Sequence, residues 1–479
     1  MSKQKSFYIT TTLPYVNADP HIGFALELVQ SDALARYQRL LGKDVFFSTG
    51  TDEYGQKIWE ASQKEGKDTR DYVDYYAQKF SGLREILNLS YDNFIRTTSP
   101  EHIKASQEFW RLCDQKGDIY KKIYRGLYCV GCEKFITEKD LMDGFCSLHP
   151  SKKPEVVKEE NYFFRISNYK KQLLEYLSGD KVIVPEWRRK EAIDFVEDGM
   201  EDFSISRDKK RLTWGIPIPE DDTQTMYVWF GALVNYISTL GWPHSKGAFE
   251  KFWQNGENVQ TAGKDQVKFQ SVMWQGMLMS AGLPTTDTVI YHGFITGEGG
   301  IKMSKSLGNV INPSDIVKEY GTDALRYFLL REISPFEDSP FTIERFKDAY
   351  NAGLANGLGN LTSRILTLSE KYLDKCPEIP EKSNFTEYFK FFEKFDIKQA
   401  VDYIWNEIGE LDKFIQKAEP FKVIKVDEKK GKELISNMVL RLYNIARMLN
   451  PIMPETNELL KKLIKKNKKP EQPLFLRKD

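Results

Sequence analysis

The first 52 residues alternate between short strand-like segments and one amphipathic stretch, and this order restricts the fold most. Residues 7–11 and 45–47 are typical of short strands, and apolar residues recur at helical spacing from about 23 until Gly42. Strand, helix and strand in this order predict a doubly wound, Rossmann-like parallel sheet, in which ligands bind at the carboxyl ends of the strands. Residues 289–291 are expected to form a late strand of the same sheet.

Changes of pattern divide the rest of the chain. A charge-rich segment with a cysteine cluster interrupts the α/β pattern, and helical periodicity dominates after about residue 350. We therefore expect an α/β domain in two halves with a connective domain inserted between them, followed by an all-helical bundle. The predicted ranges are 1–116, 117–212, 213–349 and 350–479.

Composition excludes several classes of protein. The chain carries 69 basic and 69 acidic residues, so its net charge is zero and any nucleic-acid binding requires local basic patches. Neither an N-terminal apolar signal segment nor a run of about 18 apolar residues is present. We expect a cytoplasmic protein that does not enter the membrane.

The cysteine cluster has the spacing of a metal site. Cys129-x-x-Cys132 and Cys146-x-x-His149 supply four ligands for one tetrahedral Zn²⁺. No position is left for water, so this zinc is expected to be structural; the alternative is three buried cysteines and an unrelated histidine. The remaining cysteines are expected to be ordinary buried thiols (Cys113 and Cys376).

Two motifs far apart in the sequence are suited to bind a polyphosphate. Residues 302–306 read Lys-Met-Ser-Lys-Ser and follow Gly299 and Gly300, which gives a mobile cationic loop. Residues 21–23, His-Ile-Gly, follow the first predicted strand and open a helix, where a histidine N–H and helix-end amides can hold phosphate. The lysine loop alone is usually a solvated turn, and the three-residue motif alone is weak.

Together the two motifs resemble the signature of class I aminoacyl-tRNA synthetases, and other segments resemble the methionyl-tRNA synthetase family. These segments are residues 15–23, 49–57, 227–230, 263–265 and 302–306. The zinc pattern, the Trp-Gly-Ile-Pro sequence at 214–217 and the helical tail also match that family. The resemblance covers nearly the whole chain.

The resemblance implies a methionine–tRNA ligase. Methionine and ATP, with Mg²⁺, form methionyl-adenylate and release pyrophosphate, and the methionyl group then passes to the terminal adenosine of tRNA(Met). The first step depends on positioning and on neutralising phosphate charge. The implied catalytic residues are His21, Lys302 and Lys305, and the implied ATP-binding residues are these three with Gly23, Gly263 and Asp265.

The resemblance also implies a methionine pocket, formed by Leu13, Tyr15, Asp52, Trp229, Ala232, Tyr236, Gln266 and Gln270. Asp52 would bind the substrate ammonium, unless it caps a helix. Aromatic rings favour a thioether, although ordinary core packing explains each ring alone. Arg207 matches a family arginine near the site and could instead be a structural ion-pair partner.

The chain departs from the family at four positions. Phe24 stands where a second histidine is usual, Gly231 where aspartate is usual, Gln266 where an apolar residue is typical and Gln270 where histidine is typical. Phenylalanine cannot donate a hydrogen bond to ATP, and glutamine cannot titrate near neutral pH. We expect these changes to affect tuning and methionine selectivity more than the reaction.

Three segments of the helical region are candidates for tRNA contact. Asn360 and Arg364 lie four residues apart on one helix face and match an anticodon-contacting motif, and Phe421 stands where the family has tryptophan. Asn360 could instead be a cap and Arg364 a solvated charge. The lysine-rich segment 461–469 could attract phosphate or be a solvated face. A monomer is expected, because the chain ends soon after the bundle.

Three alternatives remain at this point. Another class I synthetase is one, although editing insertions do not fit this length and a cysteine-type site lacks a cysteine before Cys113. A tRNA-binding protein that has lost adenylation is favoured only by Phe24. A small adenylyltransferase would not explain the helical region.

Overall fold

The computed structural model separates into two compact units that are each assembled from several stretches of sequence. The first consists of Met1–Pro20, Lys43–Gly82 and Tyr91–Tyr291, and the second of His21–Gly42, Leu83–Ser90 and His292–Asp479. The structure describes residues 6–130, 134–136, 138–147, 153–198, 200–301, 303, 310–381 and 385–478. The predicted boundaries at 116, 212 and 349 do not coincide with these units and stay predictions.

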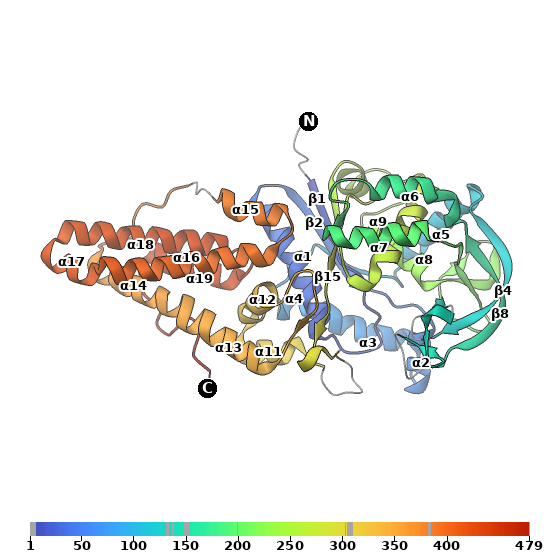
Figure 1. Ribbon diagram of the computed structural model, residues 1–479, viewed down its shortest axis with the longest axis horizontal. Helices are drawn as coiled ribbons and strands as arrows, with labels where there is room; N and C mark the ends of the chain where they lie inside the picture. The colour runs from blue at the N-terminus through green and yellow to red at the C-terminus, as the bar shows by residue number, and fades with distance from the viewer. Residues whose placement is uncertain are drawn as a thin grey trace. The chain divides into compact units, whose positions relative to one another are not determined.

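A six-stranded sheet forms the centre of the first unit, in the order β3-β2-β1-β14-β15-β9. Figure 1 labels its strands β1, β2 and β15. The bounds are β1 Ser6–Thr10, β2 Asp44–Thr51, β3 Asn93–Arg96, β9 Ile183–Val184, β14 Glu257–Gly263 and β15 Thr288–His292. The pairs β3–β2, β2–β1, β1–β14 and β15–β9 are parallel, which confirms the predicted α/β fold. Because β2 and β14 flank β1 on opposite sides, the strand order reverses beside β1, where such sheets bind ligands.

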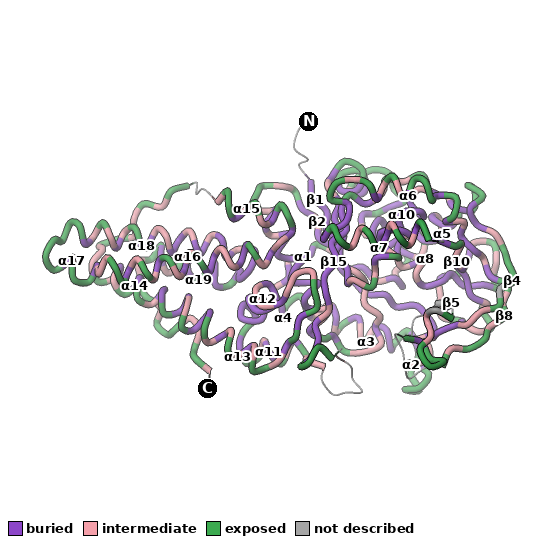
Figure 2. The backbone as a smooth tube through the Cα atoms, viewed as in Figure 1, coloured by how far each residue is buried: buried purple, intermediate pink, exposed green. Residues whose placement is uncertain are grey.

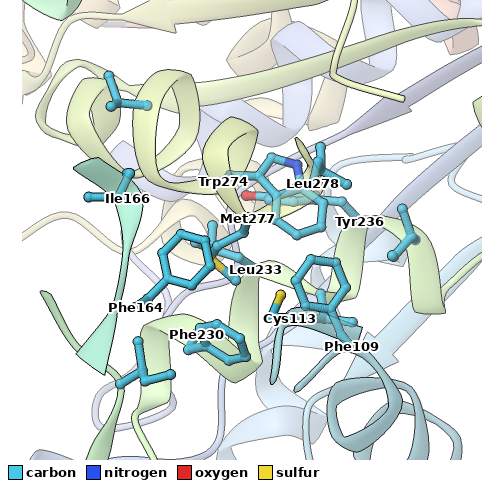
Figure 3. Close-up of a cluster of buried hydrophobic side chains, with 14 of the residues drawn as sticks. Phe109, Cys113, Phe164, Ile166, Phe230, Leu233, Tyr236, Trp274, Met277 and Leu278 are labelled. Carbon is cyan, nitrogen blue, oxygen red and sulfur yellow. The ribbon is translucent and has the colours of Figure 1, made fainter. Parts of the chain in front are cut away.

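The sheet is buried as a parallel sheet should be. Every residue of β1 and of β15 is buried, as Figure 2 shows. The helices of this unit are α2 Gln56–Lys64, α3 Thr69–Ser81, α5 Pro100–Gln115, α6 Lys170–Leu177, α7 Glu186–Glu197, α8 Val228–Leu233, α9 Asn235–Ser238 and α10 Trp274–Ser280. Phe109 of α5 stacks on Trp274 of α10 with ring centroids 5.6 Å apart, and Phe230 of α8 packs beside them (Figure 3).

Residues 117–212, predicted as an insert, contribute both a separate sheet and a strand of the main sheet. An antiparallel sheet in the order β10-β8-β4-β5 contains β4 Ile119–Cys129, β5 Lys134–Ile136, β8 Glu155–Phe164 and β10 Phe203–Ser204. The short strand β9 lies in the same range and pairs with β15. The antiparallel sheet therefore departs from the α/β pattern as expected, but the range as a whole is not independent of the main sheet.

The second unit is mainly helical. Its helices are α1 Ile22–Leu40, α4 Leu83–Ile86, α11 Pro313–Tyr320, α12 Thr322–Arg331, α13 Ile343–Ala349, the π-helix η8 Tyr350–Gly359, α14 Asn360–Tyr372, α15 Thr386–Glu393, α16 Ile397–Ala418, α17 Pro420–Val426, α18 Glu428–Met448 and α19 Pro454–Lys466. The predicted apolar stripe of Leu354, Leu358, Leu361 and Ile365 is fully or almost fully buried. Contacts of α18 with α14, α16 and α19 build the expected bundle.

Helix α1 packs within the second unit, although the strands before and after it belong to the first. The ring of Tyr37 stacks on Phe392 of α15 with centroids 4.3 Å apart. Gly42 ends the helix region with φ +77°, a conformation that glycine adopts without strain. Across the described ranges of the chain, a helix long and apolar enough to cross a membrane does not occur.

Candidate active site

Three adjacent strands bring four of the eight predicted methionine-pocket residues to one edge of the sheet. Leu13 and Tyr15 follow β1, Asp52 follows β2, and Gln266 lies three residues after Gly263, which ends β14. These strands are parallel neighbours, so their carboxyl ends lie side by side. A bridge pairs Tyr15 with Asp52 directly, and the Asp52 amide donates to the carbonyl of Pro14 across 3.0 Å.

The carboxylate of Asp52 is almost completely buried. Its Oδ1 accepts hydrogen bonds from the Thr97 hydroxyl at 3.3 Å and from the Tyr54 amide at 3.5 Å. Helix α2 begins at Gln56 and its N-cap residue is Gly55. The alternative that Asp52 caps this helix is therefore wrong.

Three aromatic rings lie together at two of the predicted pocket residues, Tyr15 and Trp229. Trp229 stacks on Phe269 with centroids 4.1 Å apart and planes inclined by 14°, and Tyr15 meets the Trp229 ring edge-on at 6.3 Å. Ala232 lies on the next turn of α8 and is half-buried. The Trp229 Nε1 atom is buried and has no hydrogen-bond partner among the described residues. Sequence reasoning missed Phe269, although its place beside Gln270 was a usable signal.

Tyr236 is a predicted pocket residue that also makes contacts in the core. Its hydroxyl accepts a hydrogen bond from Gln270 Nε2 at 2.9 Å, and its ring packs 5.8 Å from Trp274 in the cluster of Figure 3. The spacing of Trp229, Ala232 and Tyr236 predicts one helical face, but the helix is interrupted, because α8 ends at Leu233 and α9 begins at Asn235. The Tyr236 ring packs in the core, and its place in the methionine pocket stays a prediction.

Two of the unusual residues have a clear environment. Gln266 is half-buried and donates to Asp265 Oδ2 at 3.0 Å. At Gly231 an added Cβ would lie 3.0 Å from Ile216 Cδ1 and 3.4 Å from Met226 Sδ. An aspartate at position 231 would therefore require the end of the Ile216 side chain to shift by a few tenths of an ångström.

His21 lies at the N-terminus of α1, as predicted, and is exposed to solvent. Its Nδ1 accepts a hydrogen bond from the Gly23 amide at 3.1 Å, so the N–H of the neutral ring is at Nε2. The Ile22 amide donates to the Ile311 carbonyl at 2.9 Å. The expectation that the helix-end amides are available for phosphate is therefore wrong for Ile22 and Gly23 in this conformation. Phe24, beside them, is half-buried.

The lysine loop can be followed only at its start. Gly299 and Gly300 have φ of +68° and +76°, and the Gly297 amide donates to the Ile301 carbonyl at 2.7 Å. These glycines supply the turn that the sequence predicted. Two predicted catalytic residues, Lys302 and Lys305, lie outside the described residues.

Half of the predicted zinc site is described. Cys129 at the end of β4 and Cys146 at the end of β7 (Phe145–Cys146) are buried and pack with Ile136 in one small cluster. Cys132 and His149 lie outside the described residues. Within the described ranges, no group of three or more potential metal ligands occurs.

Of the two cysteines outside the cluster, one is buried as expected and the other is not. Burial raises the pKa of Cys113 to about 12, so it is the expected inert thiol, whereas Cys376 is only half-buried.

Arg207 is buried near the rings of Tyr128 and Tyr227, with its Cζ atom 5.0 and 4.5 Å from their centroids. These contacts give Arg207 a structural role.

The predicted tRNA residues lie on the surface of the helical unit. Asn360 is the first residue of α14 and is exposed; the N-cap position belongs to Gly359, so the cap alternative is wrong. Arg364 forms an ion pair with Asp412 of α16 and is not merely a solvated charge. Phe421 is the second residue of α17, and 41% of its surface is exposed.

The lysine-rich segment is not uniformly solvated. Burial lowers the pKa of Lys461, and Lys468 pairs with Glu370 at 2.8 Å. The pair with Glu370 offsets part of the positive charge that this segment offers to a phosphate backbone.

The geometry agrees with comparisons to known proteins. The family model for "tRNA synthetases class I (M)" matches residues 7–151 and 136–366. A methionine–tRNA ligase of Thermotoga maritima is 39% identical over 97% of this chain and 76% of its own length. The chain belongs to the methionyl-tRNA synthetase family.

Other members of the methionyl-tRNA synthetase family are also similar to this chain in sequence and in fold. The methionine–tRNA ligase of Clostridium acetobutylicum is 40% identical over 96% of this chain and 73% of its own length. The Mycobacterium tuberculosis methionyl-tRNA synthetase in complex with methionyl-adenylate superposes with a TM-score of 0.90 at 34% identity, covering 96% of this chain and 94% of that one. Its apo form gives a TM-score of 0.84 at 30% identity, over 99% of both chains.

Proposed function

We propose that this chain activates methionine with ATP, releases pyrophosphate and transfers the methionyl group to the 3′ adenosine of tRNA(Met). The arrangement of Tyr15, Asp52 and Trp229 at adjacent strand ends carries the proposal. A buried carboxylate and a pair of perpendicular aromatic rings suit the two ends of methionine, its ammonium and its thioether.

In this proposal Asp52 binds the substrate ammonium, and the rings of Tyr15 and Trp229 contact the sulfur. Leu13, Ala232 and Gln266 complete the wall of the pocket. Tyr236 and Gln270, which are joined by a hydrogen bond from the Gln270 amide to the Tyr236 hydroxyl, are proposed to contact the substrate as well.

ATP activation needs positioning and charge neutralisation more than covalent chemistry. His21 is exposed at the N-cap of α1, and a histidine at this position is suited to donate a hydrogen bond to a phosphate oxygen. Lys302 and Lys305 supply positive charge, and Gly263 with Asp265 binds the nucleoside. Mg²⁺ held by ATP reduces the negative charge that these residues must offset.

Structural zinc would be held by Cys129, Cys132, Cys146 and His149. Two described thiols end strands and share one buried cluster, which is the donor chemistry that a zinc site requires. Asn360, Arg364 and Phe421 would contact the anticodon through hydrogen bonds and stacking. Cytoplasmic location and a monomeric state stay predictions.

Amino-acid-dependent exchange of pyrophosphate into ATP tests the activity. We expect exchange with methionine and its loss in Asp52→Ala, with Asp194→Ala on α7 as an acidic control far along the sequence. Exchange with another amino acid but not with methionine would overturn the specificity. Absence of exchange with all amino acids would favour a tRNA-binding protein without adenylation.

A further inference from the structure

Asp52 and Glu53 are adjacent acidic residues whose side chains have different partners. Glu53 is fully buried, and its carboxylate accepts from Arg96 Nε at 2.6 Å and from Arg96 Nη2 at 2.9 Å. The hydroxyl of Thr51 donates to the same carboxylate at 2.7 Å, and Thr98 donates as well. The charge of Glu53 is therefore balanced within the protein.

The backbone between the two carboxylates is also fixed. The Glu53 carbonyl accepts from Trp214 Nε1 at 2.6 Å, and the Glu53 amide donates to the Thr97 hydroxyl at 2.8 Å. Glu53 therefore has little conformational freedom, because Arg96 binds both oxygens of its carboxylate and both of its backbone groups are hydrogen-bonded. Glu53 acts as an anchor for the residue before it.

Thr97 connects this anchor to Asp52. Its hydroxyl accepts from the Glu53 amide, so its own proton is available to Asp52 Oδ1, which lies 3.3 Å away. Only 1% of Thr97 is exposed, so water does not compete for the contact.

A close approach of two strands brings Thr97 to this position. At Gly50 an added Cβ would lie 1.9 Å from the carbonyl oxygen of Ile95, so only glycine allows β2 and β3 to meet here. The Thr97 amide then donates to the Thr51 carbonyl at 3.2 Å, directly after the last strand residue. Thr97 is therefore held by its backbone as well as by its hydroxyl.

We propose that Thr97 is a positioning residue that orients the Asp52 carboxylate for the ammonium group of the amino-acid substrate. The inference rests on the proposed function, because it needs Asp52 as the ammonium ligand. The hydrogen bond from the Thr97 hydroxyl fixes the position of Asp52 Oδ1. Because both oxygens belong to one carboxylate, the same bond also fixes the direction of the second oxygen. Thr97 itself does not touch the substrate.

The test compares three variants in methionine-dependent pyrophosphate exchange. Thr97→Val removes the hydroxyl at nearly constant volume, and Thr97→Ser retains it. The matched control is Thr322→Val in the second unit, which removes a hydroxyl that donates to the Ile86 carbonyl at 2.9 Å. One hydrogen bond to a charged group corresponds to about a tenfold change, so we expect Thr97→Val to raise the KM for methionine about tenfold. The KM of Thr97→Val for ATP, and the KM of Thr97→Ser and of Thr322→Val for methionine, are expected to stay within about twofold of the parent values.

A second readout separates positioning from a general loss of structure. Inhibition constants are measured for methioninol, which keeps the ammonium, and for the α-hydroxy analogue of methionine, which lacks it. Thr97→Val is expected to weaken the binding of methioninol and to leave the binding of the α-hydroxy analogue unchanged. Equally weakened binding of both compounds, or an unchanged KM for methionine, overturns the role of Thr97. Parent protein that exchanges pyrophosphate without methionine, or not at all, overturns the proposed function instead.

Discussion

Arg326 donates to Asp32 across 2.7 Å at a place where neither side chain is exposed to solvent. The same guanidinium donates to the carbonyls of Leu87, Pro451 and Ile452. Burial alone would raise the pKa of Asp32, but Arg326 and Arg36 outweigh it and lower that pKa. This ion pair joins α1 to α12 and to the turn between α18 and α19.

Replacing Arg326 by methionine is expected to destabilise the protein strongly. The substitution leaves the Asp32 carboxylate buried without its main cation, which costs about 3–5 kcal/mol. Urea denaturation should show a lower midpoint, and the double variant with Asp32→Leu should recover part of the loss. A single variant as stable as the parent would contradict the role of this pair.

Stability is expected to fall in mild acid because of His102. Burial lowers the pKa of His102 to about 3, while in the unfolded chain this histidine titrates near its ordinary pKa of 6.5. The stabilising effect is complete above pH 6.5 and is lost as the pH falls toward 3, because only the unfolded state binds the proton. The expected slope is about 1.4 kcal/mol per pH unit, measured by urea denaturation between pH 6.5 and 4. His102→Gln should remove this component, and an unchanged slope in that variant would refute the assignment.

Trp229→Ala is expected to raise the KM for methionine about tenfold, because a ring–sulfur contact contributes about 0.3–1.5 kcal/mol and 1.4 kcal/mol is a factor of ten. Steady-state pyrophosphate exchange measures this change. Trp187, which is 55% exposed on α7, provides the control, and Trp187→Ala should leave the KM unchanged. Equal effects of the two substitutions would argue against a methionine contact.

Arg364→Ala is expected to reduce tRNA charging about tenfold while leaving pyrophosphate exchange intact, since a hydrogen bond from a charged group contributes about 1.5–3 kcal/mol. Its ion pair with Asp412 is exposed, so the loss of stability should be small. Arg111, in a comparable exposed pair with Glu108, is the matched control. A parallel loss of charging and exchange would show that Arg364 acts on the fold.

Local periodicity was sufficient to predict some of the elements that carry candidate site residues, although it did not predict β14. The spacing of Leu26, Val29, Leu34 and Tyr37 predicted α1, and the apolar run at 45–47 predicted β2; both are present. These patterns depend on which residues face the core, and a single sequence records that directly.

Contacts between distant polar residues could not be predicted in this way. The link from Asp52 to Thr97 depends on β3 lying next to β2, and nothing in the separation of 45 residues indicates it. Likewise, the engagement of the Gly23 amide by His21 Nδ1 is a matter of side-chain rotamer rather than of residue type. The break between α8 and α9 reflects local packing that the spacing of Trp229, Ala232 and Tyr236 does not encode.

The chain passes between its two units five times, after residues 20, 42, 82, 90 and 291. Tyr37 of α1 stacks on Phe392, far along the sequence, so the surface of α1 is completed by the C-terminal helices. A fragment that stops near residue 349 would expose this surface to water. The helical bundle is therefore not an independent module. Its loss would disturb α1, the helix that His21 caps.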